Sequence, residues 1–547
     1  MLKYLKQNWE VRIIVLLAIL TIWPLIVPGY FSHHDDLHII RIVEMRKCFA
    51  DLQIPCRWAP DVGGGYGSPL FNYYNPFVYY LGGVISYFVG FIGATKLLFF
   101  ITLGLGPLTI YLLGRELWGK QAGLVAAILL MFAPYRALDA YVRGAIAELF
   151  AISLVPLLLL FSLRLYKNGK ARDFVLLTVF GGVFLLTHNV SVLIWSPFLL
   201  LWFVLLVMKY GFERKCVMRM LTALVLALGL SAFFILPAFF EKNLVTSSTL
   251  IQGDLDYHLH FASIKQLLGR FWGYGASKYG VGDELSMQVG WPYWWLLLPE
   301  IILLAYTILK RKKVKLLLIP SFLVLITAAA LLMTHNKSTI IWETFGILAF
   351  IQFPWRYLGV AVIGLSLLGG YIFKKATMVS ISAIVILIVF LNWSYFRPEK
   401  FYTNRTDLDV LSGQLWENAQ LGAVKDYLPG SAVVPTKVSG IPEVKSGEAT
   451  ITSFNNYSNH WKLEAFVSRD ALVELPVFDF PNWEIRGAAL YAASSEGKIL
   501  VELKPGNNKV EGYFKNTTIR IISNLLSIAS IIVLGFLSAY GKNRKII

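Results

Sequence analysis

Residues 149–165 read Leu-Phe-Ala-Ile-Ser-Leu-Val-Pro-Leu-Leu-Leu-Leu-Phe-Ser-Leu-Arg-Leu, and the basic segment 166–172, Tyr-Lys-Asn-Gly-Lys-Ala-Arg, follows at once. A second apolar run, 174–188, begins just after it. Apolar runs of about 20 residues are long enough to cross a bilayer as helices, and they recur along almost all of the 547 residues. Only 15% of the residues are charged, against about a quarter in soluble proteins. We therefore predict a polytopic α-helical membrane protein and exclude a soluble globular protein.

Short basic loops between the apolar runs orient the predicted helices. The formal net charge of +17 is spread over these loops rather than gathered in one patch, so it indicates topology and no nucleic-acid partner. The basic segments are 115–120, 166–172, 209–219, 310–315, 374–375 and 542–545. If all of them are cytoplasmic, the chain has about twelve spans, both termini lie in the cytoplasm, and the protein resides in the plasma membrane.

The predicted spans lie near 11–29, 97–114, 121–135, 149–165, 174–188, 190–208, 219–238, 291–309, 315–333, 356–373, 377–393 and 519–540. The apolar stretch 77–94 does not fit this series, because a crossing there would invert the side assigned to five basic loops. We interpret it as a membrane-embedded or interfacial helix on the outer side.

Three segments between spans are long enough to carry function on the outer side. Residues 30–75 and 241–290 are outer loops of a transmembrane bundle formed by residues 1–393. Residues 394–516 alternate apolar and polar side chains in short runs between Gly, Pro and Asn turns, which predicts an extracytoplasmic β-sandwich-like module. Residues 517–547 then form a final span and a basic tail. Cys48 and Cys56 share the first outer loop, so one disulfide is possible if that loop faces an oxidising compartment.

The first outer loop contains a cluster of candidate catalytic groups. Ser32 and Asp35 fit a capping box, and the apolar positions after them predict an amphipathic helix on the membrane surface. Asp36 has no such structural role. Together with His38 and Arg41 it is a candidate general base at the outer lipid boundary. Solvated acids at a helix start are the alternative interpretation.

These motifs resemble a known family of membrane proteins. The resemblance covers most of the chain and includes Asp35-Asp36 with His38 and Arg41, Arg57-Trp58, Gly65-Tyr-Gly-Ser-Pro69, Tyr73-Tyr-Asn-Pro76, Tyr141-Val-Arg-Gly-Ala-Ile-Ala-Glu148, Leu186-Thr-His-Asn189, Gln352-Phe-Pro-Trp-Arg-Tyr357 and Phe480-Pro-Asn-Trp483. The family is known as 6-pyruvoyl-tetrahydropterin synthase-related, and its layout is similar to that of the GT-C glycosyltransferases.

The resemblance implies a GT-C-like bundle and an inverting transfer of a sugar from a polyprenyl-phosphate donor lipid. The acceptor, on the outer face, would be a glycan, a lipid or a protein. The catalytic acid of such enzymes lies in the first outer loop, which implies a role for Asp36 or Asp35, and the capping interpretation of Asp35 favours Asp36. Arg143, Arg356 and His188 are candidate donor-phosphate ligands. His38, Arg41, Glu148 and Gln352 are candidate supporting groups. Snorkelling to lipid headgroups is the alternative for both arginines.

The second outer loop contains a possible metal site. In a strand, Asp254, Asp256, His258 and His260 would share one face and could bind a divalent metal ion. In a helix only pairs such as Asp256 and His260 would meet. The metal-dependent oligosaccharyltransferases of the GT-C group carry a similar acidic motif.

Two other functions compete with glycosyl transfer. Glu300 lies near the centre of a predicted span, which is costly unless it lines a cavity, and this favours a lipid or polysaccharide transporter. A non-catalytic envelope-assembly protein, with the β-module binding a partner, would need neither a polar pocket nor a midplane cavity. Most of the candidate polar residues lie at the outer boundary rather than the midplane, which favours the enzyme.

The charge pattern makes a direct topological prediction. Cysteines introduced at Ser32, Ser263 and Ser446 should react with a membrane-impermeant maleimide from the non-cytoplasmic side. Labelling of any of them from the cytoplasmic side alone would contradict a shared outer location for Asp36, Arg143, His188, Asp256 and Arg356.

Overall fold

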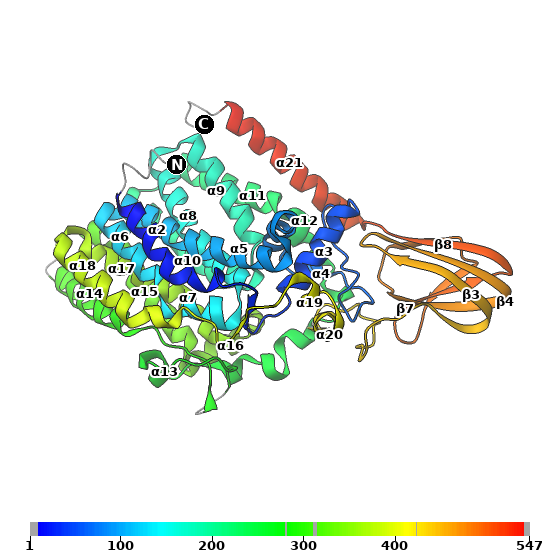
Figure 1. Ribbon diagram of the computed structural model, residues 1–547. Helices are drawn as coiled ribbons and strands as arrows, with labels where there is room; N and C mark the ends of the chain where they lie inside the picture. The colour runs from blue at the N-terminus through cyan, green and yellow to red at the C-terminus, as the bar shows by residue number, and fades with distance from the viewer. Residues whose placement is uncertain (1–8, 279–281, 310–313, 423, 541–547) are drawn as a thin grey trace.

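Long apolar helices form the larger part of the chain in the computed structural model, which describes residues 9–278, 282–309, 314–422 and 424–540 (Figure 1). A helix satisfies all its backbone hydrogen bonds internally, as a lipid environment requires. The helices are α2 (Trp9–Ile22), α3 (His38–Ala50), α4 (Leu70–Tyr73), α5 (Phe77–Trp118), α6 (Lys120–Met131), α7 (Pro134–Leu138), α8 (Ile146–Asn168), α9 (Ala171–Leu185), α10 (Asn189–Tyr210), α11 (Arg214–Leu230), α12 (Ala232–Phe240), α13 (Ile264–Leu268), α14 (Trp291–Leu309), α15 (Val314–Thr334), α16 (Thr339–Thr344), α17 (Leu358–Ile372), α18 (Met378–Asn392), α19 (Asp407–Val410), α20 (Gly413–Leu421) and α21 (Thr518–Tyr540).

The number of membrane crossings differs from the sequence prediction. In the described ranges, seven helices are long and apolar enough to cross a membrane. Two further helix pairs, α6 with Pro134–Arg143 and α11 with α12, meet the same test but are bent by 44° and 73°. The predicted spans 11–29 and 174–188 correspond to α2 and α9, of 14 and 15 residues, which is shorter than the 17 or so that a crossing needs. A count of twelve is therefore not confirmed.

Helix α5 joins two segments that the sequence suggested were separate. It runs for 42 residues through both 77–94 and 97–114, with its helical conformation broken at Gly90 (φ 72°). The carboxylate of Asp407 accepts hydrogen bonds from the Phe91 and Ile92 amides at 2.7 and 2.8 Å and so caps the second half. A side chain at residue 90 would collide with this carboxylate. The break divides α5 into residues 77–89 and 91–118, and at about 1.5 Å per residue only the second part is long enough by itself for one crossing.

The ends of the bundle are consistent with termini on one side. In Figure 1 the beginning of α2 and the end of α21 lie at the same end of the molecule. Which compartment that end faces stays a prediction from the basic loops.

The C-terminal module is one branched antiparallel sheet. Its strands are β3 (Glu443–Asn456), β4 (His460–Phe478), β5 (Trp483–Arg486), β6 (Leu490–Ala493), β7 (Lys498–Leu503) and β8 (Gly506–Phe514). The order is β5-β8-β4-β7-β6, with β3 on the other edge of β4. The 19-residue β4 pairs with β8 along its first half and with β7 along its second. The strands thus form one hydrogen-bonded sheet rather than the two sheets of the predicted sandwich, and the sheet begins only at Glu443.

Residues 394–421 belong with the bundle rather than the sheet. The two-residue strand β2 (Phe401–Tyr402) pairs antiparallel with β1 (Tyr30–Phe31) of the first loop. Val410 and Trp416, on the short helices α19 and α20, pack on the main hydrophobic core of the bundle.

The first loop also supplies part of the module's core. Trp58 is fully buried among Phe480, Trp483 and Phe514, with ring centroids 5.2–6.1 Å apart. Gly67, with φ at 85°, faces this ring so closely that a Cβ would lie 2.5 Å from it. Trp58 is therefore a structural residue, and neither a lipid-belt nor a sugar-stacking position.

A buried ion pair fixes the helix that follows the module. Glu241, at the end of α12, accepts a hydrogen bond from Nε of Arg520 at 2.8 Å, and the Thr517 hydroxyl donates to the same carboxylate. Arg520 is fully buried and also packs over Phe514, with its guanidinium carbon 5.2 Å from the ring centroid. The pair ties α12, α21 and the end of the sheet together.

Glu241→Ala should lower the thermal stability of the detergent-solubilised protein. The change leaves a buried guanidinium without its counterion, which typically costs about 3–5 kcal/mol. Glu448→Ala removes the partner of Arg469 in a pair with both side chains exposed, and its unfolding temperature should stay near that of the wild type. Equal melting temperatures for Glu241→Ala and wild type would contradict this role for the pair.

Candidate active site

A cavity of about 890 Å³ lies where the first loop, the start of α8, the turn before α10 and the 3-10 turn Pro354–Tyr357 meet. Its volume lies in the range of small-molecule sites. Its acidic and basic lining residues are His34, Asp35, His38, Arg41, Arg143, Glu148, His188, Asp254, His260, Lys278, Arg356 and Asp426. Most of the candidate site residues from the sequence analysis therefore line one cavity, although some of them lie more than three hundred residues apart in the chain.

Asp35 reaches this cavity and Asp36 does not. The carboxylate of Asp35 accepts a hydrogen bond from Arg41 Nη1 at 3.0 Å and is 31% exposed. Asp36 is 81% exposed and lines a separate cavity. The predicted capping box is wrong, because α3 begins at His38, its N-cap Leu37 has no side-chain bond, and the Ser32 hydroxyl bonds to Lys400. The structural reason for preferring Asp36 therefore disappears.

Helix α3 is embedded rather than lying on the membrane surface as predicted. Its apolar residues Ile40 and Ile42 and its polar residues His38 and Glu44 are all buried, so the first two turns leave no face to solvent. The helix supplies a wall of the cavity.

The polar groups at the start of α3 form a defined network. His38 Nε2 donates to the Gly144 carbonyl at 2.5 Å, so that its Nδ1 can accept from the Tyr79 hydroxyl at 3.2 Å. Burial lowers the pKa of His38, which keeps the ring neutral. The guanidinium of Arg41 lies 4.3 Å from the ring centroid of Tyr74.

The charge of Asp35 is fixed by Arg41. Burial alone would raise the pKa of Asp35, but the adjacent guanidinium outweighs it and holds that pKa below its usual range. Asp426, on the same cavity wall, is affected in the opposite direction, because burial raises its pKa and the charge of Arg41 only partly opposes this. Asp35 and Asp426 are therefore two carboxylates of different basicity in the same cavity.

Arg143 and Arg356 share one carboxylate. Glu148 Oε2 lies 3.0 Å from Arg143 Nη2 and 3.5 Å from Arg356 Nε, and Tyr135 donates to Oε1 at 2.5 Å. The two arginine side chains are 10% and 11% exposed, so neither snorkels to a lipid headgroup. Arg143 also pairs with Asp139 and stacks on Trp355 at 4.4 Å.

The pairing of Arg143 with Glu148 is not one that sequence spacing predicts. Five residues apart on a regular helix, the two side chains would not face each other. The chain between them is not a regular helix, since a π-turn ends at Arg143 and Gly144 is left-handed (φ 72°).

Gln352 and His188 complete this wall. The Gln352 amide accepts from Arg356 Nη1 at 3.2 Å and donates to the Leu250 carbonyl of the second outer loop at 2.9 Å. His188 caps α10 by accepting the Ser191 amide on Nδ1 at 3.3 Å. Its other nitrogen, Nε2, therefore carries the proton. Burial lowers the pKa of His188 to about 3, and the charges of Glu148, Arg356, Arg143 and Asp35 all act on the ring.

The second outer loop does not form the strand that a four-residue metal site would need. Residues Gly253–Leu255 and Tyr257–His260 are 3-10 turns. His258 pairs with Asp256 at 2.7 Å, whereas His260 Nε2 contacts the backbone carbonyl of Asp254 at 2.8 Å. In the part of the chain that is described, no three His, Cys, Asp or Glu side chains are grouped as metal ligands. A divalent ion stays a prediction, and metal removal from the purified protein tests it. The side chain of Glu300 lies outside the described residues.

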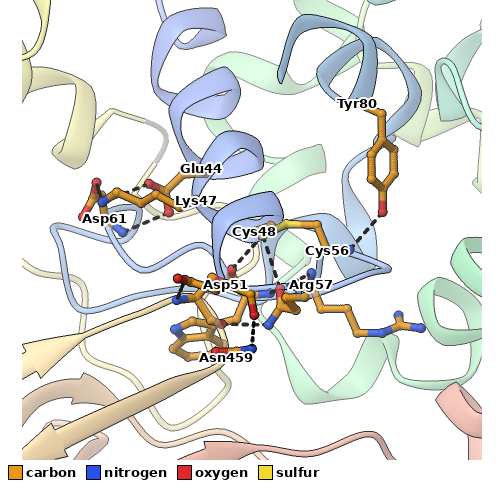
Figure 2. Close-up of a disulfide and its surroundings, with 12 residues drawn as sticks. Glu44, Lys47, Cys48, Asp51, Cys56, Arg57, Asp61, Tyr80 and Asn459 are labelled. Carbon is orange, nitrogen blue, oxygen red and sulfur yellow. Dashed lines mark hydrogen bonds and ion pairs between the residues drawn. A yellow bond between two sulfur atoms is a disulfide. The ribbon is translucent and has the colours of Figure 1, made fainter. Parts of the chain in front are cut away.

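A disulfide supports the first loop behind the cavity. Cys48, near the end of α3, is joined to Cys56, with Cα atoms 5.5 Å apart, as the sequence allowed (Figure 2). The turn between them holds the β-module, because Asp51 accepts hydrogen bonds from the Ser458 amide at 2.7 Å and from the Asn459 side chain at 2.6 Å. The loop that carries Asp35 is thereby anchored at both ends.

Comparison with known proteins gives the family. Residues 71–398 match the family described as "6-pyruvoyl-tetrahydropterin synthase related domain; membrane protein", which is more than half of the chain. The chain belongs to this family. An uncharacterized protein of Lactococcus lactis subsp. cremoris is 26% identical over 244 residues, and the match covers 42% of this chain and 40% of that protein.

Solved structures give more distant matches to this 6-pyruvoyl-tetrahydropterin synthase-related protein. The oligosaccharyltransferase of Archaeoglobus fulgidus in the apo form is 15% identical, with a TM-score of 0.39 and coverage of 71% of this chain and 55% of that chain. The archaeal oligosaccharyltransferase AglB from Archaeoglobus fulgidus, in complex with an inhibitory peptide and a dolichol-phosphate, is 15% identical. Its TM-score is 0.39, and the match covers 78% of this chain and 57% of that chain. ArnT from Cupriavidus metallidurans in the apo state is 14% identical, with a TM-score of 0.41, and the match covers 69% of this chain and 62% of that chain. The chain spans little more than half of these proteins' length, and at such scores they assign it no activity.

Some residues of the cavity gave no signal in the sequence. Asp426 and Lys278 stand singly in polar loops, and nothing in their local pattern distinguishes them from solvated charges. Trp355, by contrast, adjoins Arg356 in a motif that the sequence already singled out.

Proposed function

We propose that this protein is a GT-C-type membrane glycosyltransferase that moves a sugar from a polyprenyl-phosphate carrier to an acceptor on the outer face of the membrane. The observation that supports this most strongly is the single cavity lined by Asp35 and by Arg41, Arg143 and Arg356. Glycosyl transfer from a lipid phosphate requires a group that takes a proton and cations that stabilise a departing phosphate. A structural scaffold has no need of either.

Arg143 and Arg356 are the proposed ligands of the donor phosphate. Without a ligand, Glu148 balances their charges, and this keeps two buried guanidinium groups in place at the cavity wall. Arg356 lines the cavity, and its buried Nε, 3.5 Å from Glu148 Oε2, makes no hydrogen bond in the described part of the chain, so Glu148 holds this guanidinium by charge. Arginine forms paired, charge-assisted hydrogen bonds that suit phosphate.

His188 is a proposed neutral donor to the same phosphate. Its Nδ1 is engaged by the Ser191 amide, so the proton is on Nε2 of a ring that lines the cavity. Because burial lowers the pKa of this ring, it supplies a hydrogen bond and no charge at neutral pH. Such a fixed donor needs no reorganisation as negative charge develops.

Asp35 is the proposed base. The acceptor oxygen forms a bond to the anomeric carbon of the sugar on the face opposite the phosphate, while the bond from that carbon to the phosphate oxygen breaks. The bonding electrons leave with the polyprenyl phosphate, where the arginines stabilise them, and the acceptor proton passes to Asp35. Since Arg41 keeps Asp35 ionised, the carboxylate is a weak base that orients the acceptor and takes its proton late, as the new bond forms.

The disulfide supports the proposed outer location of the site. Disulfides persist in oxidising compartments and are rare in the cytoplasm. Cys48 lies in α3, the helix whose first turns carry His38 and Arg41 of the cavity, so both features belong on the same, extracytoplasmic side.

Asp35→Asn should abolish sugar transfer while carrier binding persists. Loss of a general base costs roughly 10²–10⁴-fold in rate, and the amide keeps the size and polarity of the side chain. The protein is reconstituted in liposomes and supplied with a panel of radiolabelled polyprenyl-phosphate sugars, and binding of undecaprenyl phosphate is measured by native mass spectrometry. Arg356→Gln should instead weaken undecaprenyl-phosphate binding by about tenfold to a hundredfold.

Asp36→Asn and Asp426→Asn are the matched carboxylate controls, and both should retain transfer. Loss of activity in Asp426→Asn alone would move the base to Asp426. Full activity of Asp35→Asn would exclude the proposed role of Asp35.

Arg41→Gln should make activity acid-sensitive. In the wild type the pKa of Asp35 lies below its usual range, so protonation of Asp35 should not limit the rate above about pH 5. Without the guanidinium, burial raises that pKa, and activity should fall as the pH is lowered toward it. Arg41→Lys keeps the charge and should resemble the wild type. Identical pH–rate profiles for all three proteins between pH 4 and 8 would contradict the pairing.

A further inference from the structure

A second cavity lies on the other side of the Asp35 carboxylate. It has a volume of about 480 Å³ and shares His34, Asp35 and Leu37 with the larger cavity. Asp36, Arg405 and Trp416 also line it. Asp35 therefore forms part of the wall between two spaces, one carrying the phosphate ligands proposed above and one that those ligands do not reach.

An apolar groove on the bundle adjoins the second cavity at Arg405. This groove, of about 540 Å³, also has Arg405 in its lining. Ile26, Val89 and Phe100 line it with 71%, 50% and 46% of their surfaces exposed. Val89 and Phe100 belong to α5, one of the helices long and apolar enough to cross a membrane, so the groove faces the hydrocarbon.

A cation stands at the junction of cavity and groove. The guanidinium of Arg405 lies 4.0 Å from the ring centroid of Tyr402, and in the described part of the chain it makes no ion pair. Asp407, which lines the groove too, is engaged by the Phe91 and Ile92 amides and does not neutralise it. Lys96 places a second cation in the groove lining, where it donates to the carbonyls of Val27 and Gly29.

We propose that the acceptor is an anionic membrane lipid that enters from this groove. Its hydrocarbon chain would lie along Ile26, Val89 and Phe100, its phosphate at Arg405, and its headgroup hydroxyl in the second cavity within reach of Asp35. Trp416 offers a ring face to the headgroup. The assignment as an acceptor depends on the proposed glycosyltransferase function. The lipid site itself is independent of that proposed function.

The groove favours a lipid over a soluble acceptor. A peptide or free glycan would approach from water and would bury no surface against residues that face hydrocarbon. Charge complementarity selects an anionic headgroup, because Asp36 and Asp409, whose carboxylates feel the charge of Arg405, form no ion pair with it in the described part of the chain, and a phosphate would.

Lipid retention by the full-length protein tests this site without an assay of transfer. The detergent-purified protein is exposed to equal amounts of phosphatidylglycerol and phosphatidylcholine with the same acyl chains, and bound lipid is counted by native mass spectrometry. We expect phosphatidylglycerol to be retained about tenfold better, and Arg405→Gln to remove most of this preference. Arg405→Lys should keep it.

A second pair of variants tests the groove. Ile26→Trp should obstruct the chain and reduce retention several-fold, whereas Leu16→Trp alters an equally exposed residue, at 64%, on α2 outside the groove and should have no effect. Equal retention of the two lipids, or wild-type retention by both Arg405→Gln and Ile26→Trp, would overturn the lipid site. Preferential retention of undecaprenyl phosphate, lost in Arg405→Gln, would overturn the acceptor assignment and make the groove a carrier site.

The two proposals fail in different ways. Asp35→Asn should abolish transfer and leave phosphatidylglycerol retention unchanged. If retention depends on Arg405 but Asp35→Asn has no effect on transfer, the lipid site stands and the glycosyltransferase mechanism falls. If Asp35→Asn abolishes transfer and Arg405→Gln changes neither retention nor transfer to lipid, the acceptor is not an anionic lipid.

Discussion

The buried carboxylate of Glu148 determines how the charged wall of the cavity is built. Taking a guanidinium group out of water is unfavourable unless a counterion and hydrogen bonds replace the solvent. Glu148 serves Arg143 and Arg356 at once, and Tyr135 and Gln352 satisfy further polar atoms around them. Three helical segments, at residues 143, 148 and 356, are thereby held together at one point. The two arginine side chains stay at the cavity wall and do not extend into lipid or solvent.

The carboxylate of Asp35 lies where two environments meet. On one side are the arginines and His188, and on the other are Asp36, Arg405 and the apolar groove. A reaction between two lipid-borne molecules has to bring both headgroups to one place without mixing their binding sites. A shared wall formed by a short loop meets that requirement. Two hydrogen bonds fix the backbone of this loop: the His34 amide donates to the Val142 carbonyl at 2.9 Å, and the Asp35 amide donates to the Arg143 carbonyl at 3.0 Å.

Much of the architecture could be predicted from the sequence, because apolar runs and basic loops are strong local signals. The motifs that carry Asp35, Arg143, His188 and Arg356 were recognisable for the same reason. The choice between Asp35 and Asp36 could not be made from the sequence. It depended on where α3 begins, and that is decided by β1, by Lys400 and by Arg41 rather than by the spacing of Ser32 and Asp35. The pairing of Arg143 with Glu148 escaped prediction because it depends on a left-handed glycine between a π-turn and a helix. Asp426 and Arg405 reach their cavities through long-range packing alone, for which a single sequence has no local pattern.

The contacts between the first loop and residues near the end of the chain constrain the order of biogenesis. Asp51 cannot form its hydrogen bond until Ser458 has been made, and Tyr30 cannot pair until Tyr402 has been made. The ribosome makes the first member of each pair some four hundred residues earlier. During insertion the loop that carries Asp35 therefore has no completed partner surface, and Trp58 has no aromatic core to enter. Asp426 is the last residue in the lining of the cavity, so a chain that ends before it holds all the charged residues of the first loop and yet has no complete site.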